Sequence, residues 1–483
     1  MSKREKQNKP PENAMTRRHF LGATGAAAAA FTIVPRHVLG GPGFVAPSKK
    51  VNLAMIGVGG QGTFDMSNFL QNEDVQVVAV CDVYKKCDYS KFYFGGFKGW
   101  EPAQQLVNEH YAKAATNGKK NSYKGCDAFT DFYEMLDKHK DIDAISIATT
   151  DNLHAFAAMA GIKEKKHVYC QKPLTHDVWE ARQLTLAARK AGVMTQMGNQ
   201  GRAGEGNRLV VEWIRDGAIG EVKEVHAWTN RPWGYWPQGV GRPESIPSVP
   251  PALDWDKWLG PAPWRPYHPA YVPFNWRGFW DFGTGALGDM GCHILDTPVW
   301  ALNLTHPSSV YASATPFNDE TGPVGSTVHY EFPAREGLSA VDLYWYEGGL
   351  TPPRPKELED GRRMGDGSGV LMIGSKGKLL CGTYGNNPRI IPETAMKAYT
   401  RPEKTIPRVE SIYTDFIESI KTGTPACSNF EVSGPLSEIV LMGNLAVRGA
   451  GKRLQWDGVK MEVTNVPEAN QYVKREYRDG WSL

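Results

Sequence analysis

Short runs of apolar residues alternate with helical patterns through the first part of the chain. The runs have the length of buried strands, and the segments between them are expected to be helices. Strands are expected at 51–56, 75–81, 143–148 and 167–170, with helices near 104–115, 132–136, 155–164 and 177–191. Strands that alternate with helices at this spacing predict an α/β protein with a parallel sheet covered on both faces.

From residue 174 onward the pattern changes to strands followed by helices. A helix that ends near residue 216 leads to a strand, and helices at 411–422 and 435–450 come near the end of the chain. The expected strands are 221–228, 310–314, 327–332, 339–346, 369–373 and 377–381. The segment between Trp228 and Trp300 holds nine of the fifteen tryptophans and many prolines, so it is not expected to form regular structure.

The composition argues against nucleic acid and membranes as partners. The 483 residues are 41% hydrophobic and 22% charged, which is ordinary for a globular chain of two or three domains. Residues 1–46 hold seven Lys/Arg against two Glu, and the remainder has 48 basic against 50 acidic residues. The folded body therefore has no basic excess that would suggest nucleic acid or an anionic membrane as a partner. No apolar run reaches the roughly 18 residues that a membrane span needs.

The seven cysteines are odd in number, scattered and without a CxxC pair. This usage argues against a disulfide framework or a structural zinc site.

The first 46 residues have the order of a targeting signal. A basic, polar stretch ends in Arg17-Arg18 and Phe20-Leu21, and a weakly hydrophobic, Ala-rich stretch follows at 22–34. This order resembles a twin-arginine (Tat) signal, whose machinery exports proteins that have already folded. The alternative is a basic tail with a chance Arg-Arg pair. We expect export to the periplasm or another extracytoplasmic space.

A glycine-rich turn, GVGGQG at 57–62, follows the first expected strand. Gly57 permits a tight turn, Gly59 lets the backbone approach a pyrophosphate, and Gly62 lets the next helix pack close to the strand. The helix N-terminus attracts phosphates, and an acid after the next strand can accept hydrogen bonds from a ribose. Strand, turn, helix, strand and acid together predict a dinucleotide site, and a purely structural turn is the alternative. The candidate cofactor residues here are Gly57, Gly59, Gly60, Gln61, Gly62 and Asp82.

Polar residues follow two later strands, at ends that should meet the glycine turn. The carboxyl ends of parallel strands form the crevice in which ligands bind, so these residues are expected to line one site. They are Thr149, Asn152 and His154 after one strand and Gln171 and Lys172 after the next. The alternative for Lys172 is a solvated surface lysine.

An acid and a histidine are four residues apart in GALGDMGCHILD at 285–296. On a helix, Asp289 and His293 share one face and lie one turn apart. A carboxylate beside an imidazole would orient the ring and raise its basicity, as a proton-transfer pair requires. The alternatives are a helix-surface pair, a satisfied core histidine, or a divalent metal site. Since no further ligand cluster is visible in the sequence, no metal is expected.

Together these motifs resemble the Gfo/Idh/MocA family of NAD(P)-dependent oxidoreductases. The resemblance rests on the glycine turn, on ATTDNLHA at 148–155, on the lysine-proline step and on the D-x-x-x-H motif, and it covers nearly everything after residue 50. It implies a Rossmann domain at 47–173 and an α+β domain with an open, mainly antiparallel sheet at 174–483, after the Tat-like signal and linker at 1–46. It also implies a homo-oligomer, a cis peptide bond before Pro173, and a catalytic set of Lys172, Asp289 and His293.

One position departs from the family's usual Glu-Lys-Pro pattern. Gln171 can still hydrogen-bond a ribose or the nicotinamide, but it cannot help to set the pKa of the lysine by its charge. Asp82 favours NAD, because its charge would repel a 2′-phosphate, while Lys85 and Lys86 leave NADP open.

The resemblance also suggests residues for the substrate end of the site. It places Asn199 and Arg202 near the nicotinamide or the substrate. Trp236, Arg277 and Trp280 are expected to bind a sugar, because aromatic faces beside polar loops suit stacking on sugar rings. The alternative is that such tryptophans fill the core or an oligomer interface.

The activity that the resemblance implies is hydride transfer between a sugar or polyol carbon and a nicotinamide cofactor. His293 is expected to take the hydroxyl proton and Lys172 to polarise the oxygen, or the reverse. Because no free NAD pool exists outside the cytoplasm, we expect NAD to be bound before export and regenerated in place. Two alternatives stay open: a redox-neutral glycoside hydrolase or lyase that acts through a transient keto-sugar, and a sugar-binding protein with a vestigial NAD site.

Overall fold

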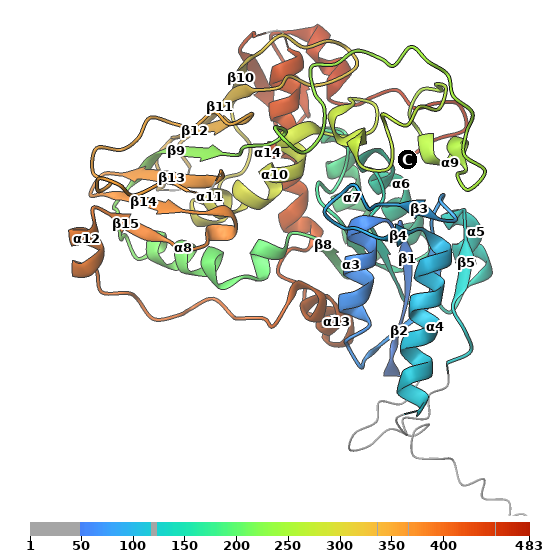
Figure 1. Cartoon of the computed structure of the whole chain (residues 1–483). Helices are drawn as coiled ribbons and strands as arrows, with labels where there is room; N and C mark the ends of the chain where they lie inside the picture. Colours follow the sequence, from blue (N-terminus) through green and yellow to red (C-terminus); the bar gives the residue numbers. More distant parts are fainter. Residues whose placement is uncertain (1–48, 117–122, 336, 366, 450) are drawn as a thin grey trace, which may run out of the picture.

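The computed structural model describes residues 49–116, 123–335, 337–365, 367–449 and 451–483. The predicted targeting segment at 1–46 lies outside these residues. The described chain forms two sheet-containing domains, a blue-to-teal one on the right of Figure 1 and a mostly green-to-orange one on the left. No helix in these ranges is long and apolar enough to span a bilayer.

The first domain consists of short strands and the helices between them. In chain order its elements are β1 (Val51–Ile56), α3 (Gly60–Phe69), β2 (Val75–Cys81), β3 (Cys87–Asp88), β4 (Phe97–Lys98), α4 (Trp100–Thr116), β5 (Asp127–Phe129), α5 (Phe132–Lys138), β6 (Ala144–Ile147), α6 (Asp151–Lys163), β7 (His167–Cys170), α7 (Val178–Ala191) and β8 (Thr195–Met197).

Six of these strands form a parallel sheet in the order β5-β2-β1-β6-β7-β8. Strand β1 shows why the sheet is covered on both faces, because its apolar side chains alternate between two cores. Leu53 and Met55 belong to the core that contains α3 and α4, whereas Ala54 and Ile56 belong to the core that contains α5 and α6. The predicted parallel sheet is confirmed.

This sheet extends past the predicted boundary at residue 173. After α7, strand β8 pairs in parallel with β7, with Thr195 opposite Val168. A helix from much later in the chain, α13 (Ile412–Thr422), also packs on this domain, where the Tyr413 ring lies 5.1 Å from that of Phe69. The boundary is therefore corrected to a point after Met197, because strand pairing and not chain position decides where the sheet ends.

The second domain contains the remaining elements. They are η2 (Gln200–Ala203), α8 (Glu205–Arg215), β9 (Val222–Trp228), α9 (Trp255–Leu259), η3 (Asn275–Gly278), α10 (Gly285–Ile294), α11 (Asp296–Ala301), β10 (Ser309–Ala314), β11 (Ser326–Phe332), β12 (Val341–Tyr346), β13 (Gly369–Gly374), β14 (Lys378–Cys381), η4 (Thr383–Gly385), β15 (Arg389–Ile391), α12 (Glu393–Ala398), α14 (Phe430–Arg448), β16 (Leu454–Asp457), β17 (Glu462–Val463) and η5 (Pro467–Tyr472).

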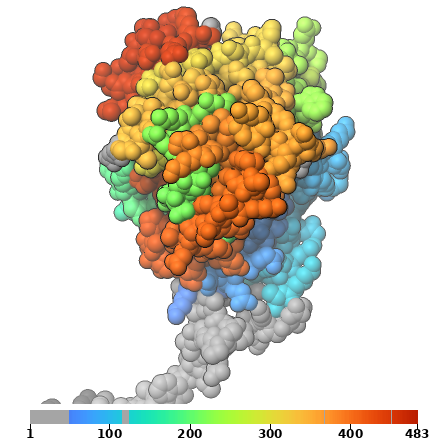
Figure 2. Space-filling view, turned by 90° about the vertical axis from the view of Figure 1, so that its left-hand side faces the viewer, coloured from blue at the N-terminus to red at the C-terminus, as the bar shows by residue number. Residues whose placement is uncertain are grey.

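Nine strands of this domain form one sheet in the order β15-β14-β13-β9-β12-β11-β10-β16-β17. Only β9 and β12 run parallel within it, so the predicted mainly antiparallel sheet is confirmed. Figure 2 looks onto this domain, with its green and orange residues at the centre of the face. Helix α14 packs on both α7 and β10 and so joins the two domains.

The tryptophan-rich segment is mostly loop up to residue 284, with α9 and η3 as short helical turns, and its last part forms α10 and most of α11. Part of it fills a small core between the domains, where Trp255 and Trp258 stack at 4.8 Å and share a cluster with Tyr84. Trp233 and Trp264 are instead 77% and 67% exposed. The seven cysteines are all free, which agrees with the expected absence of a disulfide framework.

Candidate active site

The glycine turn brings the start of α3 against the first sheet. Gly57 has a φ of 78°, and a Cβ on it would lie 2.6 Å from the Ala148 carbonyl oxygen. A Cβ on Gly62 would collide with the Gly57 carbonyl group. Both positions therefore need glycine for the turn and for close helix–strand packing.

Asp82 lies at the end of β2, beside this turn. Its Oδ2 accepts the Val58 N–H and its Oδ1 accepts the Tyr84 N–H, each at 2.8 Å. Burial raises the pKa of Asp82 to about 6, against the effect of these two hydrogen bonds. Because the carboxylate also borders the crevice, its remaining lone pairs can accept ribose hydroxyl groups. A dinucleotide fits this combination of glycine turn, helix start and acid.

An aromatic loop between β3 and β4 lies on the glycine turn. The Tyr89 hydroxyl is 2.7 Å from the place of a Cβ on Gly59, and the Phe94 ring fills the space into which a Cβ on Gly60 would project. Tyr89 and Phe94 thus border the space that Gly59 was predicted to leave open for a pyrophosphate. A bound pyrophosphate would lie beside these rings or displace them, so the loop covers the cofactor end of the crevice.

Most of the predicted cofactor and catalytic residues border one crevice at the carboxyl ends of the parallel strands. They are Gly57, Gly59, Gly60, Gln61, Asp82, Thr149, His154, Gln171, Lys172 and Asp289, and Arg277, predicted to bind substrate, borders it as well. Trp481 borders the same crevice and packs on Phe156, with ring centroids 5.2 Å apart. Sequence reasoning missed Trp481, since no local pattern near the end of the chain marks it.

Lys172 connects the two domains within this crevice. Its Nζ donates to the Asp289 carboxylate and to the Asp289 backbone carbonyl, both at 2.8 Å. The Lys172–Pro173 peptide bond is cis, as the resemblance implied. Burial acts to lower the pKa of Lys172, but contact with Asp289 outweighs it and the pKa is raised. The amine is therefore protonated at neutral pH.

Asp289 also faces two arginines. Arg277 Nε lies 3.7 Å from Oδ1, and Arg231 Nε lies 3.8 Å from Oδ2. Burial acts to raise the pKa of Asp289, but Lys172, Arg277 and Arg231 together lower it to about 2. Arg231, on the loop after β9, lies in no recognisable motif, and sequence reasoning missed it.

The structure corrects the predicted partner of His293. Asp289 and His293 are both on α10, but Lys172 engages the carboxylate, and His293 Nδ1 pairs with Asn199 Oδ1 at 3.0 Å. Asn199 is fully buried and His293 is 5% exposed, and neither is among the residues that line the crevice. Burial, and then the charge of Lys172, lower the pKa of His293 to about 3, so the imidazole is neutral. The orienting group is therefore Asn199 and not Asp289.

Two predicted polar site residues are engaged elsewhere. Asn152 is fully buried, and its side-chain amide donates to the Leu259 carbonyl at 3.0 Å. Arg202 forms a buried ion pair with Asp296 at 2.7 Å. Neither side chain borders the crevice. The polar atoms of each are instead used to satisfy buried groups elsewhere in the protein.

The two tryptophans predicted to bind a sugar are also buried. Trp236 is 7% exposed and donates from Nε1 to Gln238 at 2.9 Å. Trp280 is 6% exposed and donates from Nε1 to the Asn318 carbonyl at 3.2 Å. The structure therefore supports the core-filling alternative for both rings.

Gln171, at the position of the usual glutamate, pairs with a carboxylate on α3. Its Nε2 donates to Asp65 Oδ2 at 2.9 Å, while Gln61 and Tyr413 donate to Oδ1 at 2.7 and 2.8 Å. Asp65 is fully buried, and burial raises its pKa to about 6 against these hydrogen bonds. The amide expected to bind a ribose or nicotinamide thus donates to Asp65, and a glutamate at 171 would face a second buried acid.

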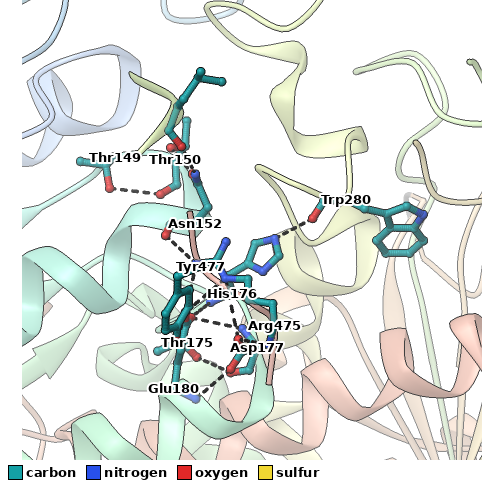
Figure 3. Close-up of polar contacts among 11 residues, drawn as sticks. Thr149, Thr150, Asn152, Thr175, His176, Asp177, Glu180, Trp280, Arg475 and Tyr477 are labelled. Carbon is teal, nitrogen blue, oxygen red and sulfur yellow. Dashed lines mark hydrogen bonds and ion pairs between the residues drawn. The ribbon is translucent and has the colours of Figure 1, made fainter. Parts of the chain in front are cut away.

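A buried ionic cluster lies at the start of α7, just after the strand end that carries Lys172 (Figure 3). Arg475, from the C-terminal segment, pairs with Glu180 at 3.0 Å and donates to the Asn152 carbonyl at 2.8 Å. The Tyr477 hydroxyl donates to the same glutamate at 3.2 Å. The cluster ties α6, α7 and the end of the chain together behind the crevice.

Two models of one oxidoreductase family match the chain. The NAD-binding Rossmann fold of the Gfo/Idh/MocA oxidoreductases matches residues 51–199, and the family's C-terminal α/β domain matches residues 214–340. Together the two matches cover more than half of the chain.

Curated relatives align over shorter stretches. A 1,5-anhydro-D-fructose reductase from Ensifer adhaerens is 38% identical over 87 residues, which are 18% of this chain and 26% of that protein. Glycosyl hydrolase family 109 protein 1 from Shewanella sp. (strain MR-4) is 27% identical over 221 residues, 43% of this chain and 44% of that protein. The chain thus aligns with less than half the length of either relative.

Solved structures share the fold over most of the chain. The WlbA dehydrogenase from Bordetella pertussis, in complex with NADH and UDP-GlcNAcA, has a TM-score of 0.53 and 16% identity, and the match covers 84% of this chain and 99% of that one. The aldose-aldose oxidoreductase from Caulobacter crescentus, complexed with glycerol, has a TM-score of 0.50 over 84% of this chain and 99% of that chain, also with 16% identity. At this identity the similarity shows a common fold.

Proposed function

The chain belongs to the Gfo/Idh/MocA oxidoreductase family, and from that premise we propose that it transfers hydride between a sugar or polyol carbon and a nicotinamide cofactor. The observation that carries the proposal is the position of the Lys172–Asp289 pair, which borders the same crevice as the glycine turn. The sugar class is supported by the curated relative named as a 1,5-anhydro-D-fructose reductase.

The cofactor end of the crevice suits NAD. The turn and the start of α3 would hold the pyrophosphate, and Asp82 would hold the adenosine ribose. Of the two lysines that left NADP open, Lys85 pairs with Glu101 at 3.4 Å and Lys86 lies over the Phe97 ring at 4.7 Å. NAD, when bound, supplies the acceptor for the hydride that leaves the sugar carbon.

The protein's own side chains must stabilise charge on the reacting oxygen and accept the proton of the hydroxyl group. Lys172 is protonated, so it donates a hydrogen bond to the reacting oxygen and stabilises negative charge there. His293 donates from Nδ1–H to Asn199, which leaves the Nε2 lone pair to accept the hydroxyl proton. As the C–H hydrogen leaves with two electrons and the O–H proton goes to Nε2, the alcohol becomes a carbonyl.

A redox-neutral glycoside hydrolase is the second candidate. The relative from Shewanella named as a glycosyl hydrolase family 109 protein favours it. In that reaction the keto-sugar would eliminate its aglycone, water would add to the unsaturated product, and the same hydride transfer would then be reversed before product release. Lys172 favours the dehydrogenase, because the glycosidases that this chain resembles typically lack the lysine of the Lys-Pro step.

We also propose export through the Tat route with NAD already bound. The order of Arg17-Arg18, the Ala-rich stretch and the following small residues supports this. Cell fractionation of the wild type and of an Arg17→Lys/Arg18→Lys variant tests it, since the variant should stay in the cytoplasm. Retention of both proteins in the cytoplasm would reject export.

The main test begins with the purified protein. Mass spectrometry of the denatured sample should detect NAD(H), and sugars should change the absorbance of the reduced nicotinamide. Release of the aglycone from aryl glycosides without a net absorbance change would identify the glycosidase instead. Sugar binding without either reaction would identify a sugar-binding protein. Lys172→Ala and His293→Ala should abolish turnover, and unchanged activity in both would reject the site.

A further inference from the structure

The side chains around Asp289, which borders the crevice, carry more positive than negative charge. Lys172, Arg231 and Arg277 all lie within 4 Å of the single carboxylate of Asp289. Only Lys172 is within hydrogen-bonding distance of the carboxylate; the two arginines approach at 3.7 and 3.8 Å. Each of the four side chains is at most 20% exposed, so water screens these charges weakly.

One other acid in the crevice influences these cations. Asp151 Oδ2 accepts the Thr284 N–H at 3.0 Å and the Thr284 hydroxyl at 2.6 Å. Its carboxylate therefore caps the start of α10 and does not pair with an arginine. Even if both Asp151 and Asp289 are counted as anions, three cations leave one positive charge unbalanced. His293 adds no charge, since it is neutral.

The two guanidinium groups are held in place by aromatic rings. Arg231 lies over Tyr235 at 3.0 Å, and Arg277 lies over Phe274 at 4.3 Å and Trp276 at 4.2 Å. Among the described residues, Arg231 Nε is enclosed and makes no hydrogen bond. A guanidinium has five N–H donors in a rigid fork, which matches the two oxygens of a carboxylate. Nη1 of Arg231 donates to the Asn230 side chain at 3.2 Å, and Nη1 of Arg277 donates to the Phe274 carbonyl at 3.0 Å. The other guanidinium N–H groups are left for a ligand.

We propose that the substrate is an anionic sugar whose carboxylate is bound by Arg231 and Arg277. The inference rests on the proposed function, in which Lys172 of the same cluster donates a hydrogen bond to the reacting oxygen of the sugar. A uronic or other sugar acid places one carboxylate and several hydroxyl groups on one small ring. Its single negative charge matches the one positive charge that the cluster around Asp289 keeps when Asp151 is also ionised, whereas a phosphate monoester would bring about two.

The test compares sugars that differ only in charge. Cofactor-loaded, full-length protein is titrated by calorimetry with glucuronate and glucose, with galacturonate and galactose, and with glucose 6-phosphate. We expect each uronate to bind at least about tenfold more tightly than its neutral partner, and Arg277→Met or Arg231→Met to weaken uronate binding by about 10- to 100-fold. Binding of the neutral sugars should change by less than about threefold.

Two variants control for folding. Arg277→Lys keeps the charge and should retain part of the preference for uronates, although a lysine lacks the planar fork. Arg242→Met removes an arginine that is 58% exposed and pairs with Glu320, so it should leave the preference unchanged.

The outcomes separate this inference from the function on which it rests. Equal binding of charged and neutral sugars, or equal losses for both in the arginine variants, would overturn the anionic substrate. Tighter binding of the phosphate than of the uronates would overturn the carboxylate. Uronate binding that the arginine variants lose, without any turnover, would reject the oxidoreductase and leave the anion site standing.

Discussion

The side-chain amide of Gln171 donates to the carboxylate of Asp65 at 2.9 Å, and the two residues are 106 positions apart. This contact joins the residue before the catalytic lysine to the helix that follows the glycine turn. Because both side chains are buried, the neutral amide at 171 and the acid at 65 depend on each other.

Gln171→Glu should therefore destabilise the protein by about 1–3 kcal/mol, because two buried acids would share one site. When burial raises the pKa of an acid, the folded state loses stability as the pH rises from the acid's pKa in the unfolded protein to its pKa in the folded protein. For Asp65 this window runs from 3.8 to about 6, and the variant should extend it upward. Urea unfolding across this pH range measures the effect. Addition of Asp65→Asn should restore most of the lost stability, and failure of this rescue would contradict the pairing.

The charge of Asp289 should control the protonation of Lys172. Asp289→Asn leaves the amine buried beside Arg231 and Arg277, so the pKa of Lys172 should fall. We expect the alkaline limb of the pH–rate profile to move down by about one pH unit or more, and kcat to fall by roughly 10²- to 10³-fold. Asp256→Asn, whose side chain is 74% exposed and pairs with Arg478, serves as the control. An unshifted alkaline limb in the Asp289 variant would show that another group sets it.

The aromatic loop on the glycine turn should slow cofactor exchange. Phe94→Ala removes the ring that contacts Gly60, and NADH release should become about tenfold faster because fewer contacts have to break. Stopped-flow fluorescence of NADH measures this rate. Phe97→Ala, whose ring is 56% exposed, should have little effect. Equal release rates for wild type and Phe94→Ala would show that the loop does not retain the cofactor.

The C-terminal segment should be required for stability. Arg475→Met leaves Glu180 and Asp177 buried without their cation, and we expect a loss of about 3–5 kcal/mol in the free energy of unfolding. The matched change Arg189→Met, in an ion pair whose side chains are 60% and 49% exposed, should cost less than about 1 kcal/mol. Urea unfolding distinguishes the two, and similar losses would show that the buried cluster has no special role.

Features that depend on residues close together in the chain were predicted correctly. The apolar runs of β1, β2, β6 and β7 identified the parallel sheet, since a strand buried on both faces must be apolar throughout. Gly57 and Gly62 were identified because a tight turn and close helix packing exclude a Cβ at these positions.

Contacts between distant segments were not predictable. The i, i+4 spacing put Asp289 and His293 on one helix face. Lys172 nevertheless binds the Asp289 carboxylate, and Asn199 pairs with the His293 imidazole. Arg231 has no motif of its own. It becomes part of the site only because the loop after β9 returns to the start of α10.

The sequence alone thus determined the two sheets, the dinucleotide turn and the acid at the end of β2, because local periodicity and backbone sterics suffice for these. Only the tertiary structure decided which polar groups pair in the crevice. Asp65 and Tyr413 are 348 positions apart and still share a hydrogen bond. Such pairings depend on how the domains pack together, and it is this packing that leaves two arginines without a carboxylate within hydrogen-bonding distance beside Lys172.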